Sequence, residues 1–163
     1  MKRTFAGLVT LVLTTVHAGA IECTQENAIY SNGSVFELSL SDPKRERIPY
    51  YLSLSNLKSG QTFGGEIEIN RDRGYPTATL GFDCKIDEQF RHLCDIDIFS
   101  HYIYVLKNLD ASLGLPKSSD PAAEAILLVD LNMSFGSYFG SDLMQQTPGD
   151  VFKLTGCQNN VAN

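Results

Sequence analysis

The run Phe36-Glu37-Leu38-Ser39-Leu40-Ser41 decides the fold, because apolar and polar residues alternate along its whole length. Strict alternation is typical of a β-strand with one face in the core and the other in solvent. Seven further stretches have strand-like patterns separated by turn-like residues. They span residues 48–55, 66–70, 78–82, 95–98, 102–106, 127–135 and 151–154.

About eight short strands without long intervening helices predict an all-β fold, a single antiparallel β-sandwich or barrel. We expect residues 151–154 to form an edge strand. Serine, aspartate and proline open the stretch 119–124, which predicts one helical turn there. The longest irregular stretch runs from residue 110 to residue 123.

The first 20 residues predict a secretory signal peptide. Lys2 and Arg3 precede a mostly apolar run, and Ala18-Gly19-Ala20 supplies the small residues of a cleavage site. We therefore expect one secreted domain over residues 21–163, which is extracellular in a eukaryote and periplasmic in a bacterium.

The composition limits the kinds of binding partner that we expect. Removing the two basic residues of the leader leaves 11 Lys and Arg against 19 Asp and Glu, a net charge of −8. An acidic chain repels phosphate backbones and anionic lipid surfaces, so neither nucleic acid nor a membrane is an expected partner. The expected partner is a protein target.

Four cysteines form an even set in a chain with a secretory leader, which predicts two disulfides. They are Cys23, Cys84, Cys94 and Cys157. We favour Cys84–Cys94, which would bridge a local loop, and Cys23–Cys157, which would tie the two ends of the domain together. The connectivity stays open, because four cysteines allow three pairings.

The aromatic segment 135–139 is a candidate recognition loop. Phe135, Tyr138 and Phe139 stand there among glycine and serine, and exposed aromatic rings give large contact area at low entropic cost. The alternative is a strand with these rings in the core, since Leu127, Leu131 and Phe135 would share one strand face.

The sequence contains no complete set of catalytic or metal-binding residues in a recognisable pattern. Asp95 with Asp97 and Glu66 with Glu68 are spaced to share strand faces. Facing carboxylates can hydrolyse glycosides or bind calcium, but a solvated sheet face has the same pattern. The sequence contains no nucleophile-elbow motif with which His92 or His101 could form a catalytic triad. We expect no enzyme activity and no cofactor.

Two glycosylation sequons begin at Asn32 and Asn132, and they matter if the source is eukaryotic. We expect Asn32 to be the more accessible. The cluster Lys44-Arg45-Glu46-Arg47 is interpreted as a solvated turn, with a processing site or partner contact as the alternative.

The central segment resembles the major Alternaria allergen family of small secreted fungal β-barrel proteins. The resemblance lies in the run Thr79-Leu80-Gly81-Phe82-Asp83-Cys84, in Leu93-Cys94, and in Asp95-Ile96-Asp97-Ile98-Phe99. It implies a protein that meets plant host defences by binding rather than by catalysis, and it assigns no functional residue.

These observations predict a secreted, non-enzymatic binding protein, a fungal effector or elicitor with a role in virulence against a host extracellular target. One alternative is a bacterial periplasmic inhibitor or immunity protein, whose acidic charge would suit a basic hydrolase or toxin. The other is a small glycan-active enzyme that uses Asp95, Asp97 or Glu68.

Overall fold

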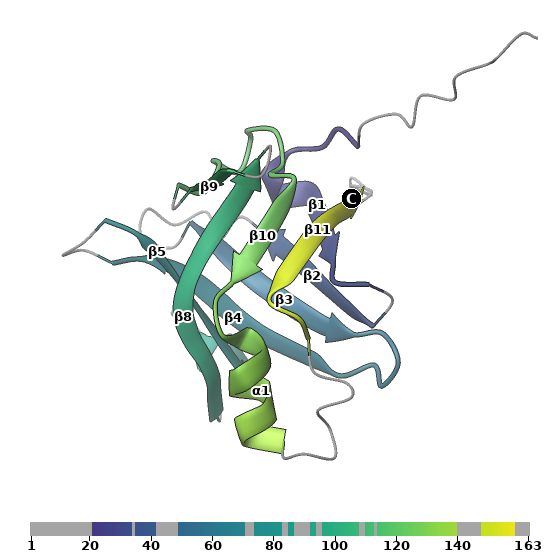
Figure 1. The fold of residues 1–163 in the computed structure, drawn as a ribbon, viewed down its shortest axis with the longest axis vertical. Helices are drawn as coiled ribbons and strands as arrows, with labels where there is room; N and C mark the ends of the chain where they lie inside the picture. The colour runs from purple at the N-terminus through teal and green to yellow at the C-terminus, as the bar shows by residue number, and fades with distance from the viewer. Residues whose placement is uncertain are drawn as a thin grey trace, which may run out of the picture.

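The structure is a computed structural model (Figure 1). It describes residues 21–33, 35–41, 49–70, 74–82, 85–86, 92–93, 96–107, 110–112, 114–139 and 148–158. The main strands are β1 (Ala28–Ser31), β2 (Phe36–Ser41), β3 (Tyr50–Asn56), β4 (Thr62–Ile69), β5 (Pro76–Phe82), β8 (Ile96–Lys107), β10 (Ala125–Leu128) and β11 (Val151–Cys157). The smaller elements are the 3-10 helix η1 (Gln25–Asn27), helix α1 (Leu131–Phe139), and the short strands β6 (Lys85–Ile86), β7 (His92–Leu93) and β9 (Asp110–Ser112).

The eight main strands close into an antiparallel barrel. Strands that follow one another along the chain are neighbours in the sheet, in the order β10-β11-β1-β2-β3-β4-β5-β8, and β8 pairs with β10 to close the ring. The long β8 makes closure possible, because it pairs with β5 near its start and with β10 near its end. The predicted all-β antiparallel fold is confirmed, and it is a barrel rather than a sandwich. Strand β9 adds to β8 as a hairpin.

Alternation places the core inside this barrel. In β2 and β3 the leucines are buried and the serines between them are only partly covered, with Leu38 opposite Leu54 and Leu40 opposite Leu52. The other strands repeat this pattern. The inward-facing residues of the remaining strands include Ala28, Tyr30, Phe63, Ile67, Ala78, Leu80, Ile103, Ile126, Leu128 and Phe152.

One glycine is required by the close approach of two strands. A Cβ atom placed on Gly65 of β4 would lie 1.9 Å from the carbonyl oxygen of Thr79 in β5. Real side chains never come so near a backbone oxygen, so only glycine fits at this inward-facing position. The close pairing of β4 with β5 at this point thus depends on a residue without a side chain.

The prediction of one strand over residues 127–135 was wrong. Strand β10 ends at Leu128, Asp130 adopts a left-handed conformation with φ 64°, and α1 begins at Leu131. Leu131 and Phe135 are four residues apart, a spacing that puts them on one face of a strand and also on one face of a helix. Met133 distinguishes the helix from the strand. In a strand it would share the buried face with Leu131 and Phe135, but it is 70 % exposed.

Three smaller predictions also need correction. Residues 151–154 belong to β11, which pairs with β10 and β1 and is therefore not an edge strand. Residues 119–124 contain no helical turn, because Pro121 forms an isolated bridge with Thr24 instead. Residues 96–98 and 102–106, which were predicted as parts of two separate strands, belong to the single strand β8 (Ile96–Lys107), and Asp95 lies outside the described residues.

A disulfide joins Cys23 to Cys157, as predicted. It links the segment before β1 to the end of β11, two strands that are already paired. Cys84 and Cys94, the other predicted pair, lie outside the described residues.

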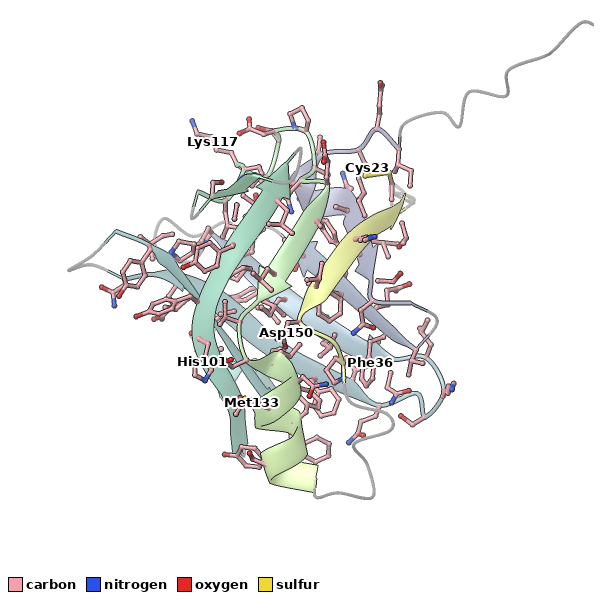
Figure 2. The ribbon with its side chains drawn as sticks, in the orientation of Figure 1. Cys23, Phe36, His101, Lys117, Met133 and Asp150 are labelled. Carbon is pink, nitrogen blue, oxygen red and sulfur yellow. A yellow bond between two sulfur atoms is a disulfide. The ribbon has the colours of Figure 1, made fainter. Side chains whose placement is uncertain are left out.

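The barrel has two differently built ends. We call the end at which α1 lies the helix end, and the opposite end, where η1, β9 and residues 114–124 lie, the mouth (Figure 1). The disulfide is at the mouth, as the position of Cys23 shows (Figure 2).

Candidate binding site at the mouth of the barrel

A buried glutamine ties the N-terminal segment to the loop that crosses the mouth. The Gln25 side chain is fully buried, and its Oε1 accepts a hydrogen bond from the backbone N–H of Ala123 at 2.8 Å. The same side chain exchanges hydrogen bonds with the Tyr30 hydroxyl, at 2.8 Å from Nε2 and 3.1 Å from Oε1. Buried polar groups are expensive when unpaired, so this network fixes the position of the loop.

The Tyr30 hydroxyl is held in its neutral form. Burial opposes the charged phenolate and raises the pKa of Tyr30 to about 12, although the hydrogen bond from Gln25 acts in the opposite direction. The hydroxyl therefore stays protonated and keeps its hydrogen bonds with Gln25 at any physiological pH.

Backbone hydrogen bonds complete the closure. The N–H of Gln25 donates to the Asp120 carbonyl at 2.9 Å, and the N–H of Ala122 donates to the Cys23 carbonyl at 2.9 Å. Earlier in the loop, the Tyr50 hydroxyl donates to the Pro116 carbonyl at 2.6 Å. These contacts bind residues 114–124 to the mouth of the barrel through polar groups.

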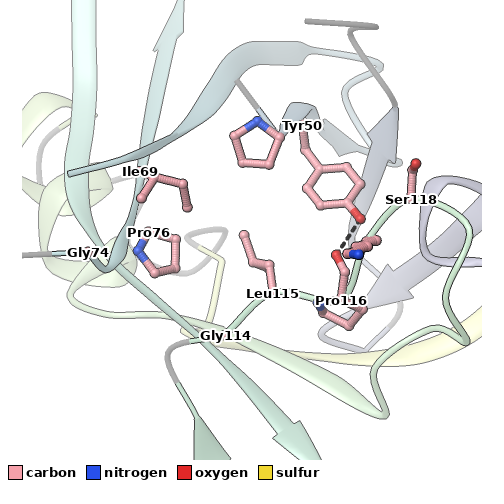
Figure 3. A pocket seen from close by; sticks show the side chains of 10 residues that line it. Tyr50, Ile69, Gly74, Pro76, Gly114, Leu115, Pro116 and Ser118 are labelled. Carbon is pink, nitrogen blue, oxygen red and sulfur yellow. Dashed lines mark hydrogen bonds between the residues drawn. The ribbon is translucent and has the colours of Figure 1, made fainter. Parts of the chain in front are cut away.

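A surface pocket of about 490 Å³ lies beside this loop (Figure 3). Three parts of the chain contribute its walls: the start of β3, the paired ends of β4 and β5, and residues 114–118. Ile69 and Pro76 face Tyr50 across the pocket with Leu115 between them. Its described lining residues are Pro49, Tyr50, Ile69, Gly74, Pro76, Gly114, Leu115, Pro116, Lys117 and Ser118. Pockets of this size accept small organic molecules, and the mouth of a β-barrel is a common place for them.

The lining is mostly apolar and includes three prolines. Among the described residues that line the pocket, Lys117 is the only charged one. Two glycines widen the space. A Cβ on Gly114 or on Gly74 would meet no atom within 4 Å, and the φ of +72° at Gly74 disfavours any other residue there. Such a site can hold an apolar molecule and orient it through a few polar groups.

The aromatic residues predicted for recognition lie at the helix end, far from this pocket. Residues 135–139 form part of α1, not a loop or a strand. Phe135 is buried, with its ring 4.9 Å from Phe63 and 6.4 Å from Phe36 between centroids. Tyr138 is 52 % exposed, and the Phe139 side chain lies outside the described residues. The structure therefore assigns Phe135 to the core and leaves Tyr138 as the exposed ring.

Neither Glu66 nor Glu68, the candidate carboxylates that the structure describes, lines the pocket. Glu66 and Glu68 lie on the outer face of β4, where they pair in register with Thr79 and Thr77. Asp95 and the side chains of Asp97 and His92 lie outside the described residues, and His101 is exposed on β8. Within the described part of the chain, no group of three His, Cys, Asp or Glu side chains is placed to hold a metal ion.

The two sequon asparagines differ in exposure, in the opposite sense to that expected. Asn32 is half-buried and its Nδ2 donates to the Gly149 carbonyl at 3.2 Å. Asn132 is exposed in the first turn of α1, and its Nδ2 donates to the Pro148 carbonyl at 3.2 Å. The basic cluster at residues 44–47 lies outside the described residues.

None of the pocket residues was singled out from the sequence. The available signal was the long irregular stretch at residues 110–123, because long connections in compact domains are often functional. Gly114-Leu115-Pro116 lies in that stretch. Tyr50 and Ile69 fall in stretches predicted as strands, and Pro76 precedes one. They lie on the neighbouring strands β3, β4 and β5, and the fold places residues 114–118 beside them.

No family model, curated protein or solved structure matches the chain. Among the described residues, no helix combines the length and the apolar character needed to cross a membrane.

Proposed function

We propose that the chain is a secreted, non-enzymatic binding protein and that its ligand occupies the pocket at the mouth. The observation that carries this proposal is the pocket itself. It is concave and mostly apolar, and it is built on strand ends that a closed, well-filled barrel holds in place. Binding sites are often made in this way, from loops and strand ends on a rigid scaffold.

The polar closure of the mouth supports this use. Gln25, Tyr30 and Tyr50 fix residues 114–124 through hydrogen bonds to the backbone or to one another. The pocket wall formed by Leu115 and Pro116 is therefore held in one position before a ligand arrives. A preorganised wall improves affinity because less conformational freedom is lost on binding.

We propose further that the protein acts outside the cell as an effector or elicitor. The predicted leader, the disulfide between Cys23 and Cys157 and the resemblance to the Alternaria allergen family support this role. Capture of a hydrolase or toxin from bacterial periplasm would instead favour the inhibitor hypothesis.

The test is capture of ligands by the secreted protein and two matched variants. Gly114→Leu adds a side chain at the wall of the pocket, whereas Gly156→Leu adds the same side chain to β11, and at both positions a Cβ meets nothing within 4 Å. Each protein is incubated with plant extracellular fluid or bacterial periplasm and re-isolated, and bound molecules are identified by mass spectrometry.

We expect one ligand to remain with the wild-type protein and with Gly156→Leu, and to be lost from Gly114→Leu. Equal retention by all three proteins would place the binding surface elsewhere. Conversion of a component of the fluid into a product by the wild-type protein would contradict the non-enzymatic assignment.

A further inference from the structure

Lys117 is the charged residue of the described pocket lining, and its side chain is exposed. Its backbone is fixed, because the Lys117 N–H donates to Asp120 Oδ2 at 3.0 Å and the Lys117 carbonyl accepts from the Asp120 N–H at 3.0 Å. An ammonium on a fixed backbone and a flexible stem can approach an anionic group on a bound molecule.

The accessible walls of the pocket are apolar. Ile69 is 43 % exposed, and Pro49, Leu115 and Pro116 are partly exposed, so these side chains present the apolar surface of the pocket. Tyr50, which lies opposite Ile69 (Figure 3), and Pro76 also line the pocket but are buried. An aromatic ring system can cover the exposed side chains and bury its own apolar surface against them.

We infer that the pocket binds a small aromatic acid, with two or three fused or linked rings against Ile69, Leu115 and Pro116 and with a carboxylate directed at Lys117. This inference rests on the proposed function and names the ligand class for the same pocket. A volume of about 490 Å³ accommodates such a molecule. The anion would pair with the one charged residue of the described lining.

The experiment compares two probes that differ in charge and share one ring system, 2-naphthoate and the neutral 2-naphthalenemethanol. Affinity is measured by isothermal titration for the wild-type protein, Lys117→Gln and Gly114→Leu. Lys153→Gln is the matched control, because Lys153 is exposed on β11 and does not line the pocket.

We expect the wild-type protein to prefer naphthoate by about fivefold, the size of a partly solvated ion pair. Lys117→Gln should bind both probes equally, Lys153→Gln should keep the preference, and Gly114→Leu should bind neither. Thermal unfolding of each variant checks that the fold is intact.

Two outcomes would overturn the inference. If the wild-type protein binds both probes equally, or if Lys117→Gln keeps the preference, Lys117 does not select anions. If neither probe binds while ligand capture remains sensitive to Gly114→Leu, the ligand is not an aromatic acid although the pocket is the binding site. Loss of that sensitivity would instead contradict the proposed function itself.

Discussion

At the helix end the barrel is closed by apolar side chains, with Phe135 of α1 packed between Phe36 and Phe63. At the mouth it is closed by hydrogen bonds, with Gln25 and Tyr50 holding the backbone of the crossing loop. Apolar closure works by filling space. Polar closure needs only a few well-placed partners and can leave a concave surface beside them, so the mouth can bind a ligand while its structure is maintained.

Removing the disulfide should have the largest effect on stability and tests the difference between the two ends of the barrel. The disulfide closes a loop with a sequence separation of 134, so removing it through a Cys23→Ala/Cys157→Ala double variant should lower the free energy of unfolding by about 4 to 5 kcal/mol. Amide hydrogen exchange should show the loss first at the mouth, at Gln25 and Ala122, and later in α1. Equal acceleration at both ends would mean that the mouth is not separately stabilised.

The helix end should respond to loss of packing. Phe135→Ala removes a buried ring and should reduce stability by about 3 to 4 kcal/mol, because the vacated space between Phe36 and Phe63 cannot fully collapse. Tyr138→Ala in the same helix is the control, and urea unfolding should show a change of less than about 0.5 kcal/mol for that exposed ring. Similar losses for both variants would contradict the assignment of Phe135 to the core.

These two ends also show what the sequence can reveal. Alternation predicted β2 with its correct bounds and most of β3. A strand with one buried face needs an apolar residue at every second position, and that pattern is visible in the sequence. The same reasoning failed at Leu131 and Phe135, whose spacing suits a strand and a helix equally. The four residues of β1 were not predicted, since so short a stretch carries little periodic signal.

The pocket was beyond prediction for a different reason. Its walls combine the neighbouring ends of β3, β4 and β5 with residues 114–118, and no local pattern in the sequence records where that distant loop lies. The Gln25 network is equally non-local, because its partner Ala123 is 98 positions away. Half of the predicted disulfide pairing is confirmed, by Cys23 and Cys157.

The polar closure of the mouth should depend on Gln25. Gln25→Ala leaves the buried Ala123 N–H and the Tyr30 hydroxyl without their partner, which should reduce stability by about 3 kcal/mol. Gln158→Ala, at an exposed position, is the matched control and should be nearly neutral in urea unfolding. If Gln25→Ala were equally neutral, hydrogen bonding would not be what closes the mouth.

The same network predicts sensitivity to alkali. The pKa of Tyr30 is about 12 in the folded protein against 10.0 ordinarily, so the folded state binds this proton more tightly than the unfolded state does. The resulting stability is fully present below pH 10 and is lost as the pH rises to 12, by about 2 kcal/mol in total. Unfolding free energies measured from pH 9 to pH 12 should therefore fall more steeply for the wild-type protein than for Tyr30→Phe. Parallel curves would show that Tyr30 is not buried as described.

The smallest expected effect concerns the start of α1, where even the apolar helix end uses one polar contact. The Asn132 N–H at the helix N-terminus donates to Asp150 Oδ1 at 2.9 Å, so a residue beside β11 supplies the cap. Asp150→Ala should lower the free energy of unfolding by about 1 kcal/mol, whereas Asp150→Asn keeps an acceptor oxygen and should lower it by less than half as much. Urea unfolding of the three proteins measures the difference. Equal losses for both variants would show that the carboxylate charge acts on the helix dipole and that the hydrogen bond contributes little, which would leave the helix end closed by its phenylalanines alone.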